Sequence, residues 1–231
     1  MDILLAKRRA ALAALDHLPE QAVLGLGSGS TASMFIDGVA AAIRNGKRFT
    51  CVATSEQSRR QALELDIPLL EDIGPWNIDL CVDGADEVSE DLDLIKGGGG
   101  CHLREKIVNA SSHYNIIIVD ETKLSPRLGR RAPVPVEVVV FGHASTAQKL
   151  RKHGRVTLRE FEGKPWLSDG GNVLYDVAMG AIESPAQLDA DLHGIPGVVE
   201  TGLFVARVDM LIVGSPLGVR RVQSAHSVKP I

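Results

Sequence analysis

Continuous apolar segments alternate with amphipathic helical patterns along the first 130 residues of the chain. The apolar segments lie at 22–27, 49–55, 78–84 and 115–120. Helical periodicity of apolar residues is found at 3–17, 30–44 and 55–65. A strand that is apolar throughout must be covered on both faces, and helices that connect successive strands provide that cover in parallel sheets. The pattern therefore predicts an α/β fold with a doubly wound, Rossmann-like parallel sheet.

The order of elements changes after residue 130. The sequence there predicts a β-α-β-β-α-β unit made of strand 134–141, helix 144–153, strands 155–161 and 172–178, helix 185–193 and strand 198–206. This is the order of a ferredoxin-like α+β domain. The apolar run at 209–215 and the tail after it have no partner in that unit, so we expect them to return to the first sheet. The sequence thus predicts two domains: a Rossmann-like domain of residues 1–130 plus 207–231, and an inserted ferredoxin-like domain of residues 131–206.

The charge balance limits the classes of ligand that the chain would bind. Its formal net charge is −4 at pH 7, whereas nucleic acids and anionic membranes are usually bound through a basic excess. Basic residues at 7–9 interrupt the apolar N-terminal stretch, which therefore reads as neither a signal peptide nor a membrane span. Cys51, Cys81 and Cys101 are odd in number and have no metal-like spacing, and two of them lie in apolar, strand-like runs. These features favour unpaired cysteines in a reducing compartment. We expect a cytoplasmic protein that binds a small molecule, with no nucleic-acid or membrane partner.

The first candidate motif is "GLGSGSTA" at 25–32, between an apolar strand and a helix. Free N–H groups and hydroxyls at a helix N-terminus suit an anion, most often phosphate. A dinucleotide fingerprint fits less well, because its last glycine is replaced by Ser30 and the next strand ends in Thr54 and Ser55 rather than in an acid. A monophosphate site is favoured, and a tight turn without a ligand remains the alternative.

The second motif is "DGADEV" at 83–88, directly after an apolar strand. Ligands in open α/β sheets bind at the carboxyl ends of the strands, so we expect Asp83 and Asp86 to face the same crevice as the glycine turn. Two carboxylates could bind sugar hydroxyls or a metal. A solvated Asp-Gly turn is the alternative reading.

The third motif is "KGGGGCHLREK" at 96–106. Successive glycine amides can stabilise a developing oxyanion, and Lys96 would add a positive charge. Glu105 would then be a base in a cation-rich pocket. The alternative is that "REK" is a solvated charge run on a helix surface and that the glycines only turn the chain.

Two further observations complete the candidate set. Lys123 follows the strand at 115–120 and is a crevice candidate by the same strand-end rule. The basic run at 127–131 is interpreted as a solvated loop. His102, His113 and His153 show no ligand spacing, so we expect no metal site.

Together these stretches resemble one family, the type A ribose-5-phosphate isomerases. The resemblance extends along nearly the whole chain through "GSGSTA", "DGADEV", "KGGGG" with "REKIV", "VDETK", "PVPVEVV", "SDGGNVLYDV" and "IPGVVETGLF". It implies reversible conversion of D-ribose 5-phosphate to D-ribulose 5-phosphate in the pentose phosphate pathway, without a cofactor. It also implies a homo-oligomer, for which we expect a homodimer with a tetramer as the alternative.

Matched motif by motif, the resemblance makes Glu105 the catalytic base, with Asp83, Asp86 and Lys96 assisting. Glu105 would move the proton between carbons 2 and 1, Lys96 with the glycine amides would hold the enediolate oxygen, and the two aspartates would position hydroxyls and assist ring opening. The substrate-binding residues implied are Ser28, Gly29, Ser30, Thr31, Asp83, Gly84, Ala85, Asp86, Lys96, Gly97, Gly98, Gly99 and Lys123. Phosphate would be held by Ser30, Thr31 and Lys123, with help from Lys7. Cys101, His102 and the basic "LGRRAPVPVEV" depart from the family pattern and could alter the polarity of the pocket.

Two rival functions remain at this stage. One is a related sugar-phosphate isomerase or deaminase, such as glucosamine-6-phosphate deaminase, which the intact acid and glycine motifs disfavour. The other is a sugar-phosphate-binding regulator without turnover. Such a regulator normally carries a DNA-binding helix pair, and the first strand begins near residue 22, which leaves no room for one.

Overall fold

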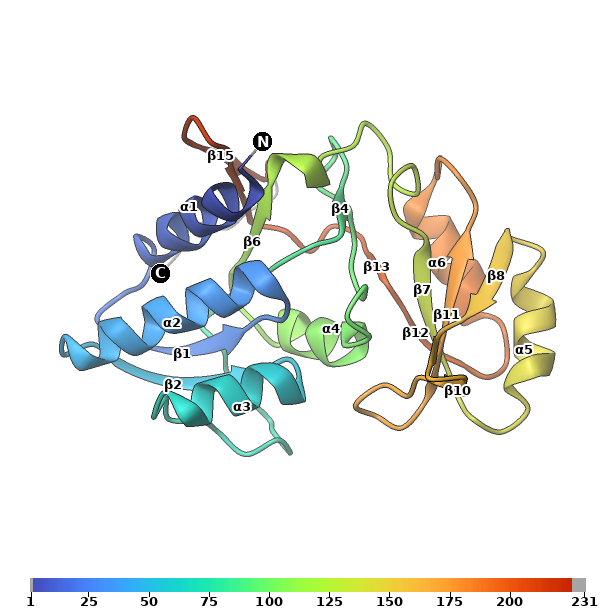
Figure 1. Cartoon of the computed structure of the whole chain (residues 1–231), viewed down its shortest axis with the longest axis horizontal. Coiled ribbons are helices and arrows are strands. Elements are labelled where there is room, and N and C mark those ends of the chain that lie inside the picture. Colours follow the sequence, from blue (N-terminus) through green and yellow to red (C-terminus); the bar gives the residue numbers. More distant parts are fainter. Residues whose placement is uncertain (1, 226–231) are drawn as a thin grey trace. The chain divides into compact units, whose positions relative to one another are not determined.

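The computed structural model describes residues 2–225, which form two compact units (Figure 1). The first unit comprises Met1–Gly84, Arg104–Thr122 and Arg207–Ile231, and the second comprises Ala85–Leu103 and Lys123–Ala206. Residues 1 and 226–231 of the predicted first domain lie outside the described residues. No helix within residues 2–225 is long and apolar enough to cross a membrane.

The first unit contains a six-stranded sheet in the order β15-β14-β6-β3-β1-β2. Neighbouring strands from β2 through β14 run parallel, and β15 is antiparallel to β14. The strands are β1 (Gln21–Leu26), β2 (Arg48–Ala53), β3 (Leu80–Asp83), β6 (Asn115–Asp120), β14 (Met210–Gly214) and β15 (Val219–Gln223). This arrangement confirms the predicted Rossmann-like parallel sheet and the return of the last apolar run to it.

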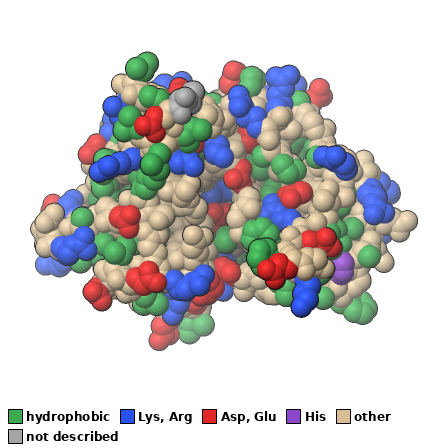
Figure 2. Space-filling model, viewed as in Figure 1, with side chains coloured by type: hydrophobic (Ala, Val, Ile, Leu, Met, Phe, Trp, Pro, Cys, Tyr) green, Lys and Arg blue, Asp and Glu red, His purple; other side chains and the backbone are tan. Residues whose placement is uncertain are grey.

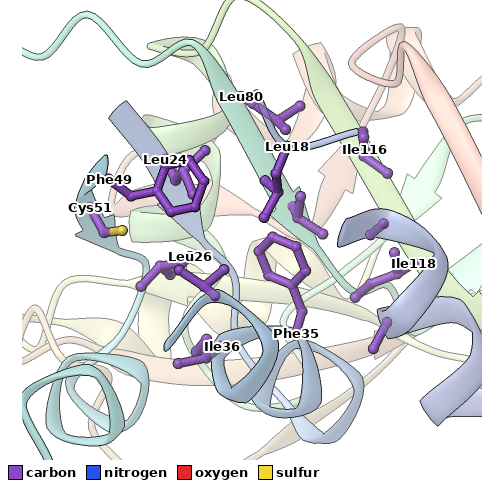
Figure 3. Close-up of a cluster of buried hydrophobic side chains, with 14 of the residues drawn as sticks. Leu18, Leu24, Leu26, Phe35, Ile36, Phe49, Cys51, Leu80, Ile116 and Ile118 are labelled. Carbon is purple, nitrogen blue, oxygen red and sulfur yellow. The ribbon is translucent and has the colours of Figure 1, made fainter. Parts of the chain in front are cut away.

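Helices cover both faces of this sheet. The helices of the first half are α1 (Ile3–Leu15), α2 (Ser30–Arg44) and α3 (Glu56–Glu64), and α4 (His102–Ala110) comes later in the chain, before β6. Phe35 and Ile36 of α2 are fully buried among side chains of β1 and β6 such as Leu24 and Ile118 (Figure 3). Val108 of α4 packs in a separate cluster with Cys81 and other residues of the opposite face. The near-continuous apolar strands are explained by this cover on both faces.

The second unit contains a four-stranded antiparallel sheet in the order β12-β7-β11-β8. Its elements are β7 (Val134–Val138), α5 (His143–Leu150), β8 (Arg155–Leu158), β11 (Val173–Ala178), α6 (Pro185–His193) and β12 (Val198–Thr201). If β7, β8, β11 and β12 are numbered 1 to 4 in chain order, their spatial order is 4-1-3-2. The predicted ferredoxin-like β-α-β-β-α-β arrangement is therefore confirmed.

Two predicted strands are wrong in their extent. The strand expected at 198–206 ends at Thr201, and β13 (Leu203–Phe204) instead joins β5 (Leu94–Ile95) and β4 (Glu87–Val88) in a three-stranded sheet. The switch occurs at Gly202, where an added Cβ would lie 2.3 Å from the Lys96 carbonyl oxygen. The strand expected at 155–161 likewise stops at Leu158, after which β9 (Glu160–Phe161) pairs with β10 (Lys164–Pro165).

The bounds of the units differ from the predicted domain bounds because 85–103 and 123–130 pack with the second unit. Glu87 gives the physical reason. Its fully buried carboxylate accepts backbone N–H groups of Gly129, Arg130, Arg131 and Ala132 at 3.0–3.2 Å. A carboxylate with several amide donors ties β4 to the segment that precedes β7. The division of the chain into the two predicted domains stays a prediction.

Candidate functional site

The turn after β1 joins the strand directly to α2. Gly29 is the N-cap of α2 with φ +90°, a left-handed conformation that favours glycine. An added Cβ on Gly27 would lie 2.2 Å from Asp83 Oδ1, so the ends of β1 and β3 approach each other closely. The structure therefore places the glycine turn and Asp83 side by side at the carboxyl ends of neighbouring strands, as the strand-end rule predicts.

Asp83 organises this turn. It is only 3% exposed, and its Oδ1 accepts the Ser28 N–H at 2.9 Å and the Gly84 N–H at 2.7 Å. Charge-assisted hydrogen bonds of this kind fix both turns relative to each other. The solvated-turn alternative does not describe Asp83, because the carboxylate is buried and bonded to backbone donors.

The Ser28 hydroxyl belongs to a cluster that the sequence analysis missed. Its Oγ lies 2.7 Å from Thr54 Oγ1 and 2.8 Å from Ser55 Oγ, at the end of β2. Ser58 Oγ, one turn into α3, donates to the Gly27 carbonyl at 2.6 Å. The hydroxyls at 54–58 therefore brace the turn from the side of α3. "TSEQS" is a hydroxyl-rich strand end, which was a signal available in the sequence.

Lys7 lies beside the start of α2. Its Nζ donates to Ser30 Oγ at 2.9 Å, although the two residues lie 23 positions apart. A cation, a hydroxyl and the N-terminus of a 15-residue helix thus meet at one place. This combination of groups suits an anion.

Glu105 and Lys106 are buried at 5% and 7% exposure, so the reading of "REK" as a solvated charge run is wrong for both. Val108, one turn after Glu105 on the same face of α4, packs against Gly25 of β1, where an added Cβ would lie 2.8 Å from its Cγ1. The missing side chain at Gly25 therefore lets α4 approach the sheet. Glu105 lies one turn before Val108 and is buried as well.

Arg104 attaches α4 to α3. Its Nη1 donates to Glu56 Oε1 at 2.8 Å, and this hydrogen bond lowers the pKa of the Glu56 carboxyl below its usual value. Both side chains are partly exposed, so the pair contributes little to stability. Its consequence is geometric, because it fixes the first turn of the helix that carries Glu105.

The glycine loop lies in the second unit. Lys96 is 3% exposed, with Nζ 5.4 Å above the centre of the Phe204 ring. Asp86 Oδ2 accepts the Gly98 N–H at 2.6 Å. The structure thus brings Asp86 together with the loop at 97–100, and its expected place in one crevice with the glycine turn at 25–32 stays a prediction. Lys123 ends a short 3₁₀ helix (Glu121–Lys123) that directly follows β6.

Among the described residues, one group of side chains has the composition of a metal site: Asp189 and His193 of α6 with Glu200 of β12. His193 Nε2 lies 2.9 Å from Glu200 Oε1, and Asp189 accepts a hydrogen bond from the Thr201 hydroxyl. These mutual contacts account for the group without an ion. His193 was not predicted as a metal ligand from the sequence, although an acid and a histidine four residues apart on a helix share one face.

Basic and acidic side chains are interspersed over the face shown in Figure 2. Such a surface does not favour a polyanionic partner over a small ligand. The parallel sheet, its braced glycine turn and the buried acids define an α/β protein with a candidate site for a small anionic ligand.

Comparison with known proteins identifies the family. Residues 50–218 match the family ribose 5-phosphate isomerase A (phosphoriboisomerase A), and the chain belongs to it. It is 42% identical over 226 residues to ribose-5-phosphate isomerase A of Thermomicrobium roseum, covering 96% of this chain and 95% of that protein. A solved D-ribose-5-phosphate isomerase in complex with phospho-erythronic acid superposes with a TM-score of 0.93 at 35% identity, covering 96% of this chain and all of that one. The isomerase A of Methanocaldococcus jannaschii gives a TM-score of 0.90 at 36% identity over 94% and 98% of the two chains.

Proposed function

We propose that Glu105 is the base with which this isomerase interconverts D-ribose 5-phosphate and D-ribulose 5-phosphate. The reaction moves a proton between carbons 2 and 1 through an enediolate, and one carboxylate can take the proton from one carbon and return it to the other. The observation that carries the proposal is the burial of Glu105, which is 5% exposed in the first turn of α4.

Lys96 and the amides of Gly97 and Gly99 stabilise the enediolate oxygen in this proposal, because the Gly98 N–H already donates to Asp86. A buried ammonium and fixed N–H dipoles act strongly on a charge that develops in a water-poor site. Lys96 meets the first condition, since it is 3% exposed. Asp86 orients the loop through the Gly98 amide.

The remaining contacts divide between sugar hydroxyls and phosphate. Asp83 and Asp86, with Gly84 and Ala85 between them, position hydroxyls and assist ring opening. The phosphate is assigned to Gly29, Ser30 and Thr31 at the N-terminus of α2, with Lys7 and Lys123 supplying positive charge. The hydrogen bond between Lys7 and Ser30 supports this assignment. The proposed reaction needs neither a metal nor a cofactor.

We also propose that the protein acts in the cytoplasm as a homodimer, with a tetramer as the alternative. Cys51, Cys81 and Cys101 form no disulfide with one another, which suits a reducing compartment. Phe141 and Phe161 of the second unit are 94% and 70% exposed, and we take them as candidates for a contact between subunits. Light scattering of the purified protein would give twice the chain mass; a monomer would contradict the proposal.

Turnover in D₂O tests the proton-transfer mechanism. If a carboxylate shuttles the proton, deuterium from solvent should enter ribulose 5-phosphate at carbon 1, because the proton on the base exchanges with water before it is returned. Mass spectrometry of the product measures this incorporation. Complete retention of the substrate hydrogen at every sampled pH would favour a direct hydride shift and contradict the enediolate.

A further inference from the structure

Arg159 follows β8 in the second unit and is held on three sides. Its Nε donates to Asp176 Oδ2 at 2.9 Å and its Nη2 donates to Asp176 Oδ1 at 2.6 Å, a two-pronged contact with β11. The guanidinium carbon lies 5.7 Å from the ring centre of Trp166. Only 11% of the Arg159 side chain is exposed. A planar guanidinium paired in this way has a single orientation.

The third nitrogen of the guanidinium, Nη1, contacts the glycine loop. Arg159 Nη1 donates to the Gly97 carbonyl at 2.7 Å and to the Gly98 carbonyl at 3.2 Å. The Gly97 carbonyl and the Gly98 N–H belong to one planar peptide unit, and that N–H donates to Asp86 at 2.6 Å. The peptide unit is therefore held at both ends, by a cation on one side and a carboxylate on the other.

This clamp also sets the direction of the next amide. In a trans peptide the C=O and N–H groups point in opposite directions, so a Gly98 carbonyl turned toward Arg159 directs the Gly99 N–H away from it. Glycine has no side chain to restrict its backbone, and a run of glycines would otherwise sample many orientations. Within the loop the Gly100 N–H donates to the Gly97 carbonyl at 2.9 Å, and the contacts from Arg159 and Asp86 add the restraint from outside it.

We propose that Arg159, oriented by Asp176, is a positioning residue that aims the amides of the glycine loop at the oxygen of the enediolate. The inference rests on the proposed function, since it assigns Arg159 a role only through that loop. Arg159 does not touch the substrate in this account. Preorganised donors are effective because they need not reorient as charge develops, and small displacements from the reactive geometry lower the rate steeply.

The test compares Arg159→Gln with Arg155→Gln, in which an exposed arginine at the start of β8 is replaced by the same residue. We expect Arg159→Gln to lower kcat by about 10- to 100-fold with KM within a few-fold of wild type, because the loop acts mainly on the transition state. Arg155→Gln should match wild type.

Phospho-erythronic acid, whose carboxylate carries a negative charge, should bind Arg159→Gln about 10-fold more weakly by calorimetry, whereas inorganic phosphate should bind both variants alike.

A purely structural role for Arg159 would lower the melting temperature and leave kcat per folded molecule and phospho-erythronate affinity unchanged, and that result would overturn the proposal. If Arg159→Gln does not fold, Asp176→Asn keeps the arginine and loosens only its support. A fall in kcat at constant KM is then expected, and an unchanged kcat overturns the proposal. Wild-type turnover and its loss in Glu105→Gln test the proposed function separately. If both hold while Arg159→Gln keeps full kcat, only the positioning role fails.

Discussion

The four glycines after Lys96 meet different steric demands. Gly97 and Gly100 have φ of +101° and +79°, which side chains rarely adopt, and an added Cβ on Gly98 would lie 2.8 Å from Asp86 Oδ1. An added Cβ on Gly99 would have nothing within 4 Å. Folding thus explains three of the glycines. The fourth, Gly99, is explained in our proposal by close approach of the substrate to the backbone.

Replacement of Gly99 by alanine separates these two demands. We expect Gly99→Ala to leave the free energy of unfolding nearly unchanged and to lower kcat/KM about 10-fold, because the added methyl group would occupy space needed by the substrate. Gly97→Ala should instead destabilise the protein by about 1–2 kcal/mol or more through its left-handed backbone. Urea unfolding and steady-state kinetics measure both effects. Full activity of Gly99→Ala would argue against substrate contact at that position.

At the scale of elements, length and pattern decide what the sequence predicts. Most helices and long strands of both sheets were predicted within a few residues, because each carries its own periodicity, whereas the strand expected at 198–206 ends already at Thr201. The two-residue strands β4, β5, β9, β10 and β13 were not, since they are too short for a pattern and depend on partners far along the chain. Glu87 shows the same limit. Its place in the motif "DGADEV" does not predict that its carboxylate accepts hydrogen bonds from four backbone N–H groups.

The role of Glu87 in joining β4 to 129–132 can be measured. Glu87→Gln should lower the free energy of unfolding by about 1–3 kcal/mol, because an amide brings an N–H₂ group among backbone donors and leaves some of them without an acceptor. Glu90→Gln, an exposed neighbour, is the matched control and should change stability by less than about 0.5 kcal/mol. Equal effects of the two substitutions in urea unfolding would show that the buried carboxylate does not hold these elements together.

At the scale of the whole molecule, the motifs predicted the class of ligand better than they predicted the environment of each residue. The glycine turn, Asp83 and the Lys96 loop were all identifiable because their residues are contiguous. The hydroxyls at 54–58 were visible only as a hydroxyl-rich strand end, and the Arg159 clamp was not identifiable, because the contact of Arg159 with Gly97 spans 62 positions of the sequence. Only the folded chain brings such residues together.

The absence of a metal requirement is a prediction about the whole protein. Exhaustive EDTA treatment should leave turnover of ribose 5-phosphate unchanged, since the proposed enediolate is stabilised by Lys96 and backbone amides alone. Turnover before and after chelation is the measurement, with Asp189→Asn as a check on the one group within residues 2–225 that has the composition of a metal site. A loss that a divalent cation restores would contradict the metal-free account.

The activity of Glu105→Gln tests the central claim most directly. Glutamine keeps the size and hydrogen-bonding ability of the buried side chain and removes its basicity, so kcat should fall by about 10²- to 10⁴-fold while KM stays similar. Glu64→Gln replaces an exposed glutamate at the end of α3 in the same way and should retain wild-type kcat. Near-normal turnover by folded Glu105→Gln, with deuterium still entering the product from D₂O, would show that another group is the base, and Asp83 would be the next residue to test.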